Sequence, residues 1–395
     1  MRRRGTQWVD AIRTAEDASD RRPPLRILHV YKDVFPSVVG GIEKQIDMIR
    51  RGMPDLISNV VVSARGPRTR VESSARLGLE ARVAEFGPRW LSVPVSPTLP
   101  LWVARIPADV IHLHMPNPAG ELAVLLAGNG RPIVASYHAD IVRQARFERA
   151  YSPLVQACLR RSGAIVVGSR RLARSSPALQ GHQSKLRLIR HSVDVERYRP
   201  GAVSERRRSE LRARYGEPLV VAVGRLVYYK GFELLIEAAR GLEGSVVIVG
   251  DGPEGPRLRA LAAGLPNVHL TGELDEDELV AHLAAADCFA MCSTSRAESF
   301  GISVAEAQAM GLPAVVADTG SGTVEAVEHG FSGLVIAPGD VTALRQALVS
   351  LLSDAPRRQA MGEAARARAV ANHAAGERMR ELAELYAEVA RSPRD

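Results

Sequence analysis

Cysteines, aromatic side chains and long apolar runs are all scarce in this sequence. The chain has three cysteines in 395 residues, Cys158, Cys288 and Cys292, and their spacing fits neither a disulfide framework nor a zinc site. Aromatic residues make up 5% and the basic residues are scattered, which argues against a nucleic-acid-binding surface. No apolar stretch approaches the length that crosses a bilayer, and none follows the basic start as in a signal peptide. These absences predict a cytoplasmic protein that binds no nucleic acid.

Basic and acidic residues are unevenly distributed along the chain. Residues 1–200 hold 32 Lys and Arg against 17 Asp and Glu, whereas the remaining residues hold 20 against 27. A basic first half suits an anionic membrane surface or a phosphorylated acceptor, and a coding bias toward arginine is the alternative. Any membrane contact is expected to be peripheral, at the inner face of the plasma membrane.

Apolar runs suited to strands alternate with helical segments twice along the chain. The first series lies at residues 26–31, 59–64, 82–87, 109–115, 132–138 and 164–169. The second lies at residues 218–226, 245–253, 268–274, 288–293, 313–318 and 333–338, and a helical tail follows. This alternation predicts an α/β fold with two Rossmann-like domains, each a doubly wound parallel sheet, facing across a cleft.

The pattern divides the chain into four segments. Residues 1–24 are polar, end in two prolines and are interpreted as a flexible arm. Residues 25–200 and 201–375 form the two domains, and the tract 185–200 is the expected hinge. Residues 376–395 form a C-terminal helix that packs back toward the first domain. In such folds the ligand binds at the carboxyl ends of the strands.

Two acids eight residues apart flank a predicted helix start in the second domain. Glu298 lies on the loop after a strand, and Glu306 lies about two turns into the next helix. Between them, Gly301 and Ile302 would present free backbone N–H groups at the helix N-terminus, a natural seat for a diphosphate. The acids could hold sugar and ribose hydroxyls, whereas an ordinary helix with an acidic first turn is the alternative.

Two cations are predicted to face the same crevice. In the segment GRLVYYKG at 224–231, Arg225 ends a strand and Lys230 begins the next helix. Together they can neutralise a diphosphate leaving group without a metal. Either residue taken alone would be interpreted as a solvated surface charge.

From Leu25 to the C-terminal helices, the sequence resembles the family 4 glycosyltransferases, retaining enzymes of the GT-B fold. The acid pair with Phe-Gly between its members is the most specific motif of the resemblance. The motifs are GGIE (40–43), SYHAD (136–140), GRLVYYKG (224–231), VGDGP (249–253), ESFGISVAEAQAMGLPAV (298–315) and GFSGLVI (330–336). The resemblance implies that residues 25–200 bind the acceptor and residues 201–375 bind the nucleotide-sugar donor.

The resemblance also assigns roles to matching residues. Glu298 would be catalytic, contacting the donor sugar's hydroxyls, and Glu306 would hold the ribose hydroxyls. The implied donor-binding residues are Gly41, Arg225, Lys230, Gly301, Ile302 and Glu306, and the acceptor-side candidates are Gly40 and Asp140. The two glycines lack Cβ atoms, so the first strand-to-helix loop can approach donor and acceptor closely.

Histidines end or line two of the predicted strands. By resemblance, His138 is catalytic, contacts the donor sugar near its reacting carbon and helps to stabilise positive charge there. Asp140 could position His138 or an acceptor hydroxyl. His112 and His114 alternate on one strand and share a face. They would suggest a metal pair, but no third ligand is evident, so a core or cleft-lining role is expected.

The implied mechanism uses no dedicated general base, no metal and no cofactor. The leaving diphosphate accepts the acceptor's proton, so catalysis is mostly positioning and stabilisation of the leaving group's charge. No Asp-x-Asp motif follows a strand, since residues 275–277 are better interpreted as the acidic start of a helix. We therefore expect no metal requirement.

The sequence identifies the donor and the acceptor less narrowly than the reaction. The opening of the first domain and the loop DTGSGTVEAV at 318–327 resemble bacterial mannosyltransferases of surface polysaccharide synthesis, which favours GDP-mannose over UDP-sugars. A saccharide or lipid-linked acceptor is expected. In the segment 143–161, cations beside Phe147, Tyr151 and Leu154 suggest an interfacial helix, and a surface helix packed on its own sheet is the alternative.

Two other functions fit the sequence less well. A Rossmann oxidoreductase or nucleotide-sugar epimerase would need a Gly-x-Gly-x-x-Gly turn after the first strand, and the loop SVVGGIE has none. A non-catalytic relative that binds a nucleotide sugar or a partner protein is opposed by the joint presence of Arg225, Lys230, Glu298 and Glu306.

Overall fold

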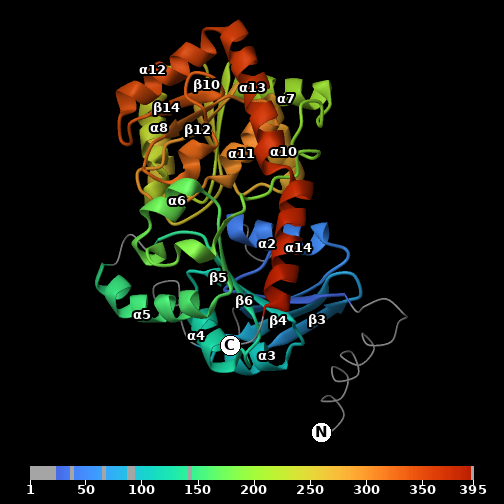
Figure 1. The fold of residues 1–395 in the computed structure, drawn as a ribbon. Helices are drawn as coiled ribbons and strands as arrows, with labels where there is room; N and C mark the ends of the chain where they lie inside the picture. The colour runs from blue at the N-terminus through green and yellow to red at the C-terminus, as the bar shows by residue number, and fades with distance from the viewer. Residues whose placement is uncertain (1–23, 36–39, 65–67, 87–93, 141–144, 393–395) are drawn as a thin grey trace.

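Two α/β domains lie one above the other along the long axis of the molecule (Figure 1). A computed structural model describes residues 24–35, 40–64, 68–86, 94–140 and 145–392. Helices α13 and α14 run along one side past both domains (Figure 1). The predicted arm, residues 1–24, lies outside the described residues except for Pro24.

The first domain is built on an eight-stranded sheet. Its strands are β1 Arg26–Tyr31, β2 Ile57–Ala64, β3 Arg70–Ser74, β4 Gly78–Ala84, β5 Val110–Met115, β6 Ile133–Tyr137, β7 Ala164–Val167 and β8 Leu186–Leu188. They lie in the order β3-β4-β2-β1-β5-β6-β7-β8, and β3 pairs antiparallel with β4 whereas the other pairs are parallel. The accompanying helices are α2 Gly41–Gly52, α3 Leu99–Arg105, α4 Pro118–Ala127, α5 Ala145–Arg161 and α6 Arg170–Ser175, with 3₁₀ turns η1 Pro177–Leu179 and η2 Gln183–Lys185.

The edge of this sheet differs from the prediction. The strand expected at 82–87 is β4, which begins at Gly78 and ends at Ala84. Strand β3 was not predicted because all five of its residues are exposed, so it lacks the apolar alternation that marks a half-buried strand. A charged, antiparallel edge strand of this kind discourages pairing with other chains.

The second domain carries a six-stranded sheet, all of it parallel. Its strands are β9 Leu219–Val223, β10 Ser245–Val249, β11 Val268–Gly272, β12 Cys288–Met291, β13 Ala314–Ala317 and β14 Gly333–Ile336, in the order β11-β10-β9-β12-β13-β14. Its helices are α7 Glu205–Tyr215, α8 Phe232–Ala238, α9 Gly255–Ala262, α10 Glu276–Ala285, α11 Ile302–Ala309, α12 Val341–Leu352 and α13 Ala355–His373. The last helix, α14 Ala375–Arg391, follows the second domain in the chain. The helix expected at 323–329 is the 3₁₀ turn η4 Gly322–Glu325, and a second 3₁₀ turn, η3, spans Tyr228–Lys230.

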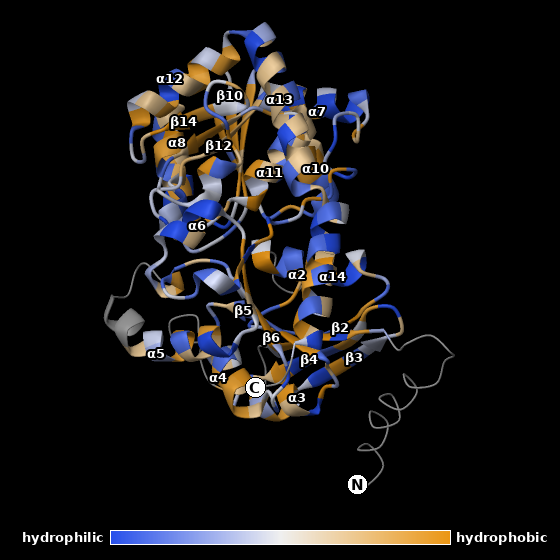
Figure 2. Ribbon diagram, viewed as in Figure 1, coloured by the Kyte–Doolittle hydropathy of each residue, from blue (hydrophilic) through white to orange (hydrophobic). Residues whose placement is uncertain are grey.

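Apolar side chains cover both faces of each sheet, as expected for parallel strands enclosed by helices. Along β1, Leu28 and Val30 pack on one face while Ile27 packs on the other with α14. In Figure 2 the strands inside each domain are mostly hydrophobic, whereas the helices around them carry both hydrophilic and hydrophobic residues. Cys158, Cys288 and Cys292 are all buried and free, which agrees with a core role.

The chain crosses between the domains twice, and the two crossings are tied together. Val193 forms a parallel β-bridge with Ala374, and its N–H donates to the carbonyl of His373 at 2.7 Å. The ring Nδ1 of His373 lies 3.0 Å from the carbonyl of His191. The first crossing lies in the tract 185–200 that the sequence suggested as the hinge.

Helix α14 packs on the first domain against β5, β6 and α2. Met379, Leu382, Leu385 and Tyr386 are buried in a cluster with Ile27. Each fully buried Leu or Met contributes about 1.5–3 kcal/mol relative to an exposed one, which is enough to hold the helix on this face.

The described part of helix α5 faces the protein interior. Tyr151 is buried and donates to Oε1 of Glu121, and Val155, Cys158 and Leu159 belong to the core of the first domain. The interfacial role suggested for Tyr151 is therefore wrong, because its ring packs under α4. The side chain of Phe147 lies outside the described residues.

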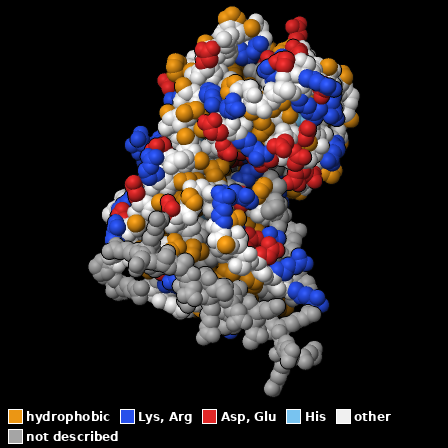
Figure 3. Space-filling view, turned by 90° about the vertical axis from the view of Figure 1, so that its right-hand side faces the viewer, with side chains coloured by type: hydrophobic (Ala, Val, Ile, Leu, Met, Phe, Trp, Pro, Cys, Tyr) orange, Lys and Arg blue, Asp and Glu red, His pale blue; other side chains and the backbone are white. Residues whose placement is uncertain are grey.

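Neither the described helices nor the visible surface stands out as strongly apolar. Among the described residues, no helix combines the length and the apolarity that crossing a membrane requires. On the face turned to the viewer in Figure 3, charged side chains of both signs are interspersed and hydrophobic ones form small separate groups.

Candidate functional site

The N-terminus of α11 opens toward the first domain. Gly301 precedes this helix with φ 73° and ψ 64°, a left-handed conformation that glycine adopts without strain. A Cβ at Gly301 would lie 2.9 Å from Sδ of Met291, so the glycine also allows close packing on β12. Among the described residues no side chain caps the helix, so its first N–H groups are available to an anion there.

Lys230 and Glu298 form a largely buried ion pair beside this helix end. Nζ of Lys230 lies 2.5 Å from Oε2 of Glu298, and the two side chains are 13% and 11% exposed. Burial alone would lower the pKa of Lys230, but the charge of Glu298 and its hydrogen bond outweigh burial and raise it. Lys230 is therefore a fixed positive charge whose side chain extends across Gly224.

Gly231 explains how Lys230 reaches this position. It has φ 66°, and a Cβ there would lie 2.1 Å from the carbonyl oxygen of Cys292, at the end of β12. Only glycine permits this approach. The turn η3 and the loop after β12 are thereby held side by side, which brings the motifs 224–231 and 298–315 together as the sequence predicted.

Glu306 is buried and faces a lysine that the sequence did not single out. Nζ of Lys44, on α2 of the first domain, lies 3.6 Å from Oε1 of Glu306 and 3.1 Å from Oε2 of Glu276. The hydroxyl of Tyr198 donates to Oε1 of Glu276 at 2.5 Å. Burial raises the pKa of Glu306, with the charge of Lys44 opposing it, whereas the charge of Lys44 helps to lower the pKa of Glu276 against burial.

This four-residue cluster joins the two domains. Its members come from α2, the hinge, α10 and α11, so no local pattern in the sequence links them. The only local signal was the acidic segment 275–277, which was interpreted as a helix start. Asp275 does cap α10, since its side chain accepts from the N–H of Glu278, but Glu276 has the additional contact with Lys44.

Gly40 and Gly41 lie at the start of α2, opposite the start of α11. A Cβ at Gly41 would lie 3.0 Å from Cδ1 of Ile302, and one at Gly40 would collide with the carboxylate of Glu43. The glycines therefore let α2 approach both Ile302 and the Glu43 side chain.

Arg225 is exposed. Burial raises the pKa of Glu43, an effect that the positive charges of Lys32 and Arg225 reduce.

His138 is buried after β6 and belongs to a row of stacked histidines. Its Nε2 lies 3.1 Å from Nδ1 of His114, and Nδ1 of His29 lies 3.1 Å from Nε2 of His114. On its other side, the ring of His138 stacks on that of His191, with centroids 5.6 Å apart. Burial lowers the pKa of His138 well below its usual value, with smaller effects from His191 and His112, so the ring is neutral at pH 7.

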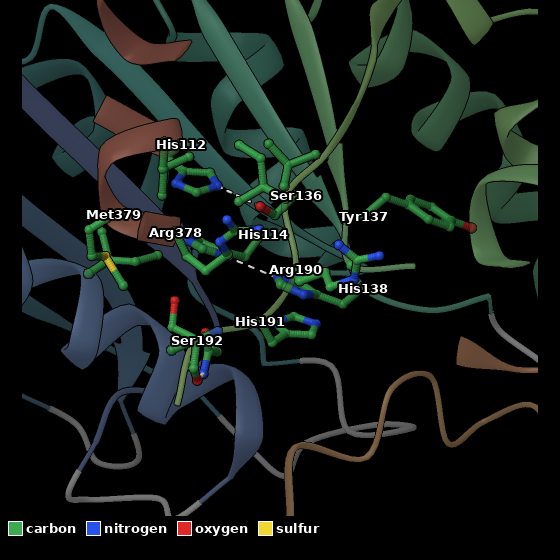
Figure 4. A pocket seen from close by; sticks show the side chains of 16 residues that line it. His112, His114, Ser136, Tyr137, His138, Arg190, His191, Ser192, Arg378 and Met379 are labelled. Carbon is green, nitrogen blue, oxygen red and sulfur yellow. Dashed lines mark hydrogen bonds between the residues drawn. The ribbon is translucent and has the colours of Figure 1, made fainter. Parts of the chain in front are cut away.

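A small cavity, about 40 Å³, lies beside this row. It is lined by residues from α2, β5, β6, the hinge and α14. His112, His114, His138 and His191 gather around it with Arg190 and Arg378 (Figure 4). A core or cleft-lining role was expected for His112 and His114, and both are buried in the core beside this cavity.

The structure supplies a third histidine beside the pair that the sequence singled out. His29, His112 and His114 each place a ring nitrogen within 4.8 Å of the others. His112 is already engaged, because its Nδ1 lies 2.5 Å from the hydroxyl of Tyr386 and its Nε2 lies 2.7 Å from that of Ser136. A metal at this group would have to displace the hydrogen bonds that His112 makes and the one between His29 and His114.

Asp140 does not contact His138. Its carboxylate accepts from the hydroxyls of Tyr137 at 2.9 Å and Ser176 at 2.6 Å, and lies 3.6 Å from Nη2 of Arg296. The idea that Asp140 positions His138 is therefore wrong in this structure, because the partner of His138 is His114. Asp140 instead takes part in a contact between the two domains.

Comparisons with known proteins agree with this arrangement. Two family models match the chain in succession, Glycosyltransferase Family 4 over residues 39–197 and Glycosyl transferases group 1 over residues 203–368.

Several curated relatives match over most of their length. D-rhamnosyltransferase WbpZ of Pseudomonas aeruginosa is 33% identical over 355 residues, covering 87% of this chain and 91% of the relative. O-antigen chain mannosyltransferase C of Escherichia coli is 29% identical over 376 residues, covering 87% and 93%. A GDP-mannose-dependent alpha-(1-6)-phosphatidylinositol monomannoside mannosyltransferase of Mycolicibacterium smegmatis is 36% identical over 381 residues, covering 89% and 96%.

Solved structures show the same fold. Anabaena HepE in complex with UDP superimposes with a TM-score of 0.73 at 22% identity, covering 92% of this chain and 100% of HepE. Sucrose-phosphate synthase of Thermosynechococcus elongatus gives a TM-score of 0.78 at 20% identity, covering 92% and 99%. Together with the family matches, these findings show that the chain belongs to glycosyltransferase family 4 and is a glycosyltransferase of the GT-B fold.

Proposed function

We propose that this enzyme retains the anomeric configuration while transferring a mannosyl or closely related hexosyl unit from a GDP-linked donor to a saccharide or lipid-linked acceptor. The observation that carries the proposal is the uncapped N-terminus of α11, with the Lys230–Glu298 pair on one side and Glu306 on the other. An uncapped helix start beside a buried cation is a ready seat for a diphosphate.

In this proposal the diphosphate lies against the backbone at Gly301 and Ile302, with Lys230 and Arg225 as its cations. Lys230 then shares its charge between the phosphate and Glu298, which is held in place to accept hydrogen bonds from the sugar's hydroxyls. Glu306 binds the ribose hydroxyls. Since Lys44 lies 3.6 Å from Glu306, ribose binding would compete with that contact.

Catalysis then depends on charge stabilisation at the leaving group. As the glycosidic bond to the diphosphate breaks, negative charge on the diphosphate grows and is met by Lys230, Arg225 and the N–H groups of α11. The leaving oxygen takes the proton of the acceptor hydroxyl as the new bond forms on the same face. His138 would lie near the reacting carbon as a neutral ring.

The donor sugar is proposed from the relatives. Those cited above are named as mannosyl- and rhamnosyltransferases, and D-rhamnose is mannose without its 6-hydroxyl. A manno-configured donor is therefore favoured. GDP-D-rhamnose is the second candidate because the relative at 33% identity is named a D-rhamnosyltransferase. UDP-sugars are the alternative donors, because one structural neighbour, HepE, was solved with UDP-glucose.

A donor panel tests this proposal. Thermal stabilisation and donor hydrolysis would be measured with GDP-mannose, GDP-D-rhamnose, UDP-glucose and UDP, with EDTA in a parallel series. We expect stabilisation and turnover with one of the GDP-sugars and no effect of EDTA. Turnover with UDP-glucose alone would contradict the donor proposal, whereas binding with no turnover in any acceptor mixture would favour a non-catalytic relative. Complete loss of activity in EDTA, restored by Mn²⁺, would refute metal-independent catalysis.

We further propose a cytoplasmic enzyme in peripheral contact with the inner face of the plasma membrane. The first domain is basic in sequence, and Leu101, Leu122 and Leu126 of α3 and α4 are 51%, 49% and 69% exposed. Flotation with vesicles containing anionic lipid should carry the protein along at low salt. Equal flotation with neutral vesicles would remove the electrostatic part of the proposal.

A further inference from the structure

Three histidines, His29, His114 and His138, form a hydrogen-bonded row whose first ring is fully buried and whose last ring lines a cavity. His29 and His114 are 0% and 1% exposed, and Nε2 of His29 is buried with no hydrogen-bond partner among the described residues. At the other end, Nε2 of His138 is occupied by His114, while the ring lines the cavity below the cleft. No hydrogen bond from Nδ1 of His138 is found in the part of the chain that the structure describes.

Hydrogen bonding allows two proton arrangements in this row. Burial lowers the pKa values of all three histidines, so each ring is neutral and carries one N–H and one lone pair. In the outward arrangement, Nδ1–H of His29 donates to Nε2 of His114, and Nδ1–H of His114 donates to Nε2 of His138. In the inward arrangement, every bond is reversed.

The unpartnered nitrogen of His29 distinguishes the two arrangements. The inward arrangement would bury an N–H donor at His29 Nε2 without an acceptor, a rare and costly state. The outward arrangement leaves only a lone pair there. This difference favours the outward arrangement.

We propose that His29 and His114 are positioning residues that hold His138 as the neutral tautomer with its proton on Nδ1, so that His138 meets the substrate as a hydrogen-bond donor. The proposal rests on the proposed function, in which His138 lies near the reacting sugar carbon. Because Nε2 of His138 already accepts from His114, it has no free lone pair to take a proton from the acceptor. His138 therefore orients an oxygen of the substrate and does not act as a general base.

Nitrogen NMR of the ligand-free, full-length protein tests this directly. With ¹⁵N-labelled histidine, long-range proton–nitrogen correlations distinguish an Nδ1–H ring from an Nε2–H ring, and the His138 signals are those missing from His138→Gln. We expect His138 to be the Nδ1–H tautomer at pH 7. A proton on Nε2 would overturn the proposal. Since no donor is present, this result does not depend on whether the proposed function is correct.

Two substitutions at His29 separate positioning from structural support. His29→Leu removes the donor to His114, whereas the side-chain amide of His29→Asn can donate from nearly the same place as Nδ1. We expect His29→Leu to lose the uniform His138 tautomer and to lower kcat about tenfold with little change in donor KM. In His29→Asn, we expect the Nδ1–H tautomer of His138 to be kept and kcat to stay within about threefold of wild type. Melting temperatures measured alongside report any loss of folding.

His112 offers a matched control. It is 1% exposed and its ring stacks on His114 with centroids 4.1 Å apart, but its hydrogen bonds go to Tyr386 and Ser136. His112→Asn should leave the His138 tautomer unchanged. Equal loss of the tautomer in His29→Asn and His112→Asn would contradict the proposal, since it would indicate general loosening. One equivalent of Zn²⁺ bound to wild type and not to His29→Leu would also overturn it, by making the row a metal site.

Discussion

At the scale of single residues, we propose that most donor affinity comes from charges that are already in place. Lys230 is fixed by Glu298 and by the short turn before Gly231, so little side-chain entropy remains to be lost when a diphosphate binds. Such preorganised groups act on charge as it develops in the transition state and need not reorganise first.

Lys230→Ala should weaken both donor binding and turnover. Removing a charge-assisted hydrogen bond costs about 1.5–3 kcal/mol, so the Kd for GDP should rise about tenfold to a hundredfold. Calorimetric titration with GDP measures this. Lys185→Ala, which removes a lysine whose Nζ bonds the carbonyl of Arg160 in the other domain, is the charge-matched control. An unchanged Kd in Lys230→Ala would remove the phosphate role of this lysine.

Glu306→Ala should raise the donor KM by about tenfold, because ribose hydroxyls lose a buried acceptor. Glu276→Ala provides the comparison, since it removes the other carboxylate beside Lys44 without touching the proposed ribose contact. Steady-state kinetics with a saturating acceptor distinguish the two. Equal effects in the two variants would mean that Glu306 acts through Lys44 and not on the ribose.

At the scale of elements, the start of α11 is the feature on which donor binding depends. Gly301→Ala should destabilise the protein by more than the roughly 1–2 kcal/mol that a left-handed conformation costs an alanine, since its Cβ would also meet Met291. Gly311→Ala is matched, because Gly311 has φ 82° at the other end of the same helix and its nearest atom is 3.4 Å away. Urea unfolding and GDP titration of both variants measure the difference. If Gly301→Ala binds GDP normally, the helix start is not the phosphate seat.

Local pattern predicted the elements that carry the site, but not every contact within it. The apolar runs and the spacing of Glu298, Gly301 and Glu306 placed a strand, a loop and a helix in succession, and the structure has them as β12 and α11. Strand β3 was missed because its residues are all exposed. The contact of Lys44 with Glu306 and that of His29 with His114 join elements distant in sequence, and each residue is unremarkable within its own helix or strand.

At the scale of the whole molecule, the two domain crossings meet at His191, which is half-buried, and His373, which is buried. Burial lowers the pKa of His191 to about 4 and that of His373 to about 4, from 6.5. The folded pKa is thus below the unfolded one, so the unfolded chain binds more protons between these values. Their contribution to stability is fully present above about pH 6.5 and is lost as pH falls toward 4.

The free energy of unfolding should therefore decrease steadily between pH 6.5 and 4. His191→Phe should reduce this slope by up to about 1.4 kcal/mol per pH unit, the value for one proton. Urea denaturation at closely spaced pH values measures the slope in both proteins. The same slope in wild type and variant would show that His191 titrates normally in the folded protein.

The central claim is that cations and one helix N-terminus converge on the donor's diphosphate, and a crystal structure of the GDP complex tests it most directly. The account predicts phosphate oxygens about 2.7–3.2 Å from the N–H groups at the start of α11 and from Nζ of Lys230, with the ribose at Glu306. A diphosphate bound elsewhere, with Lys230 still paired only to Glu298, would contradict it.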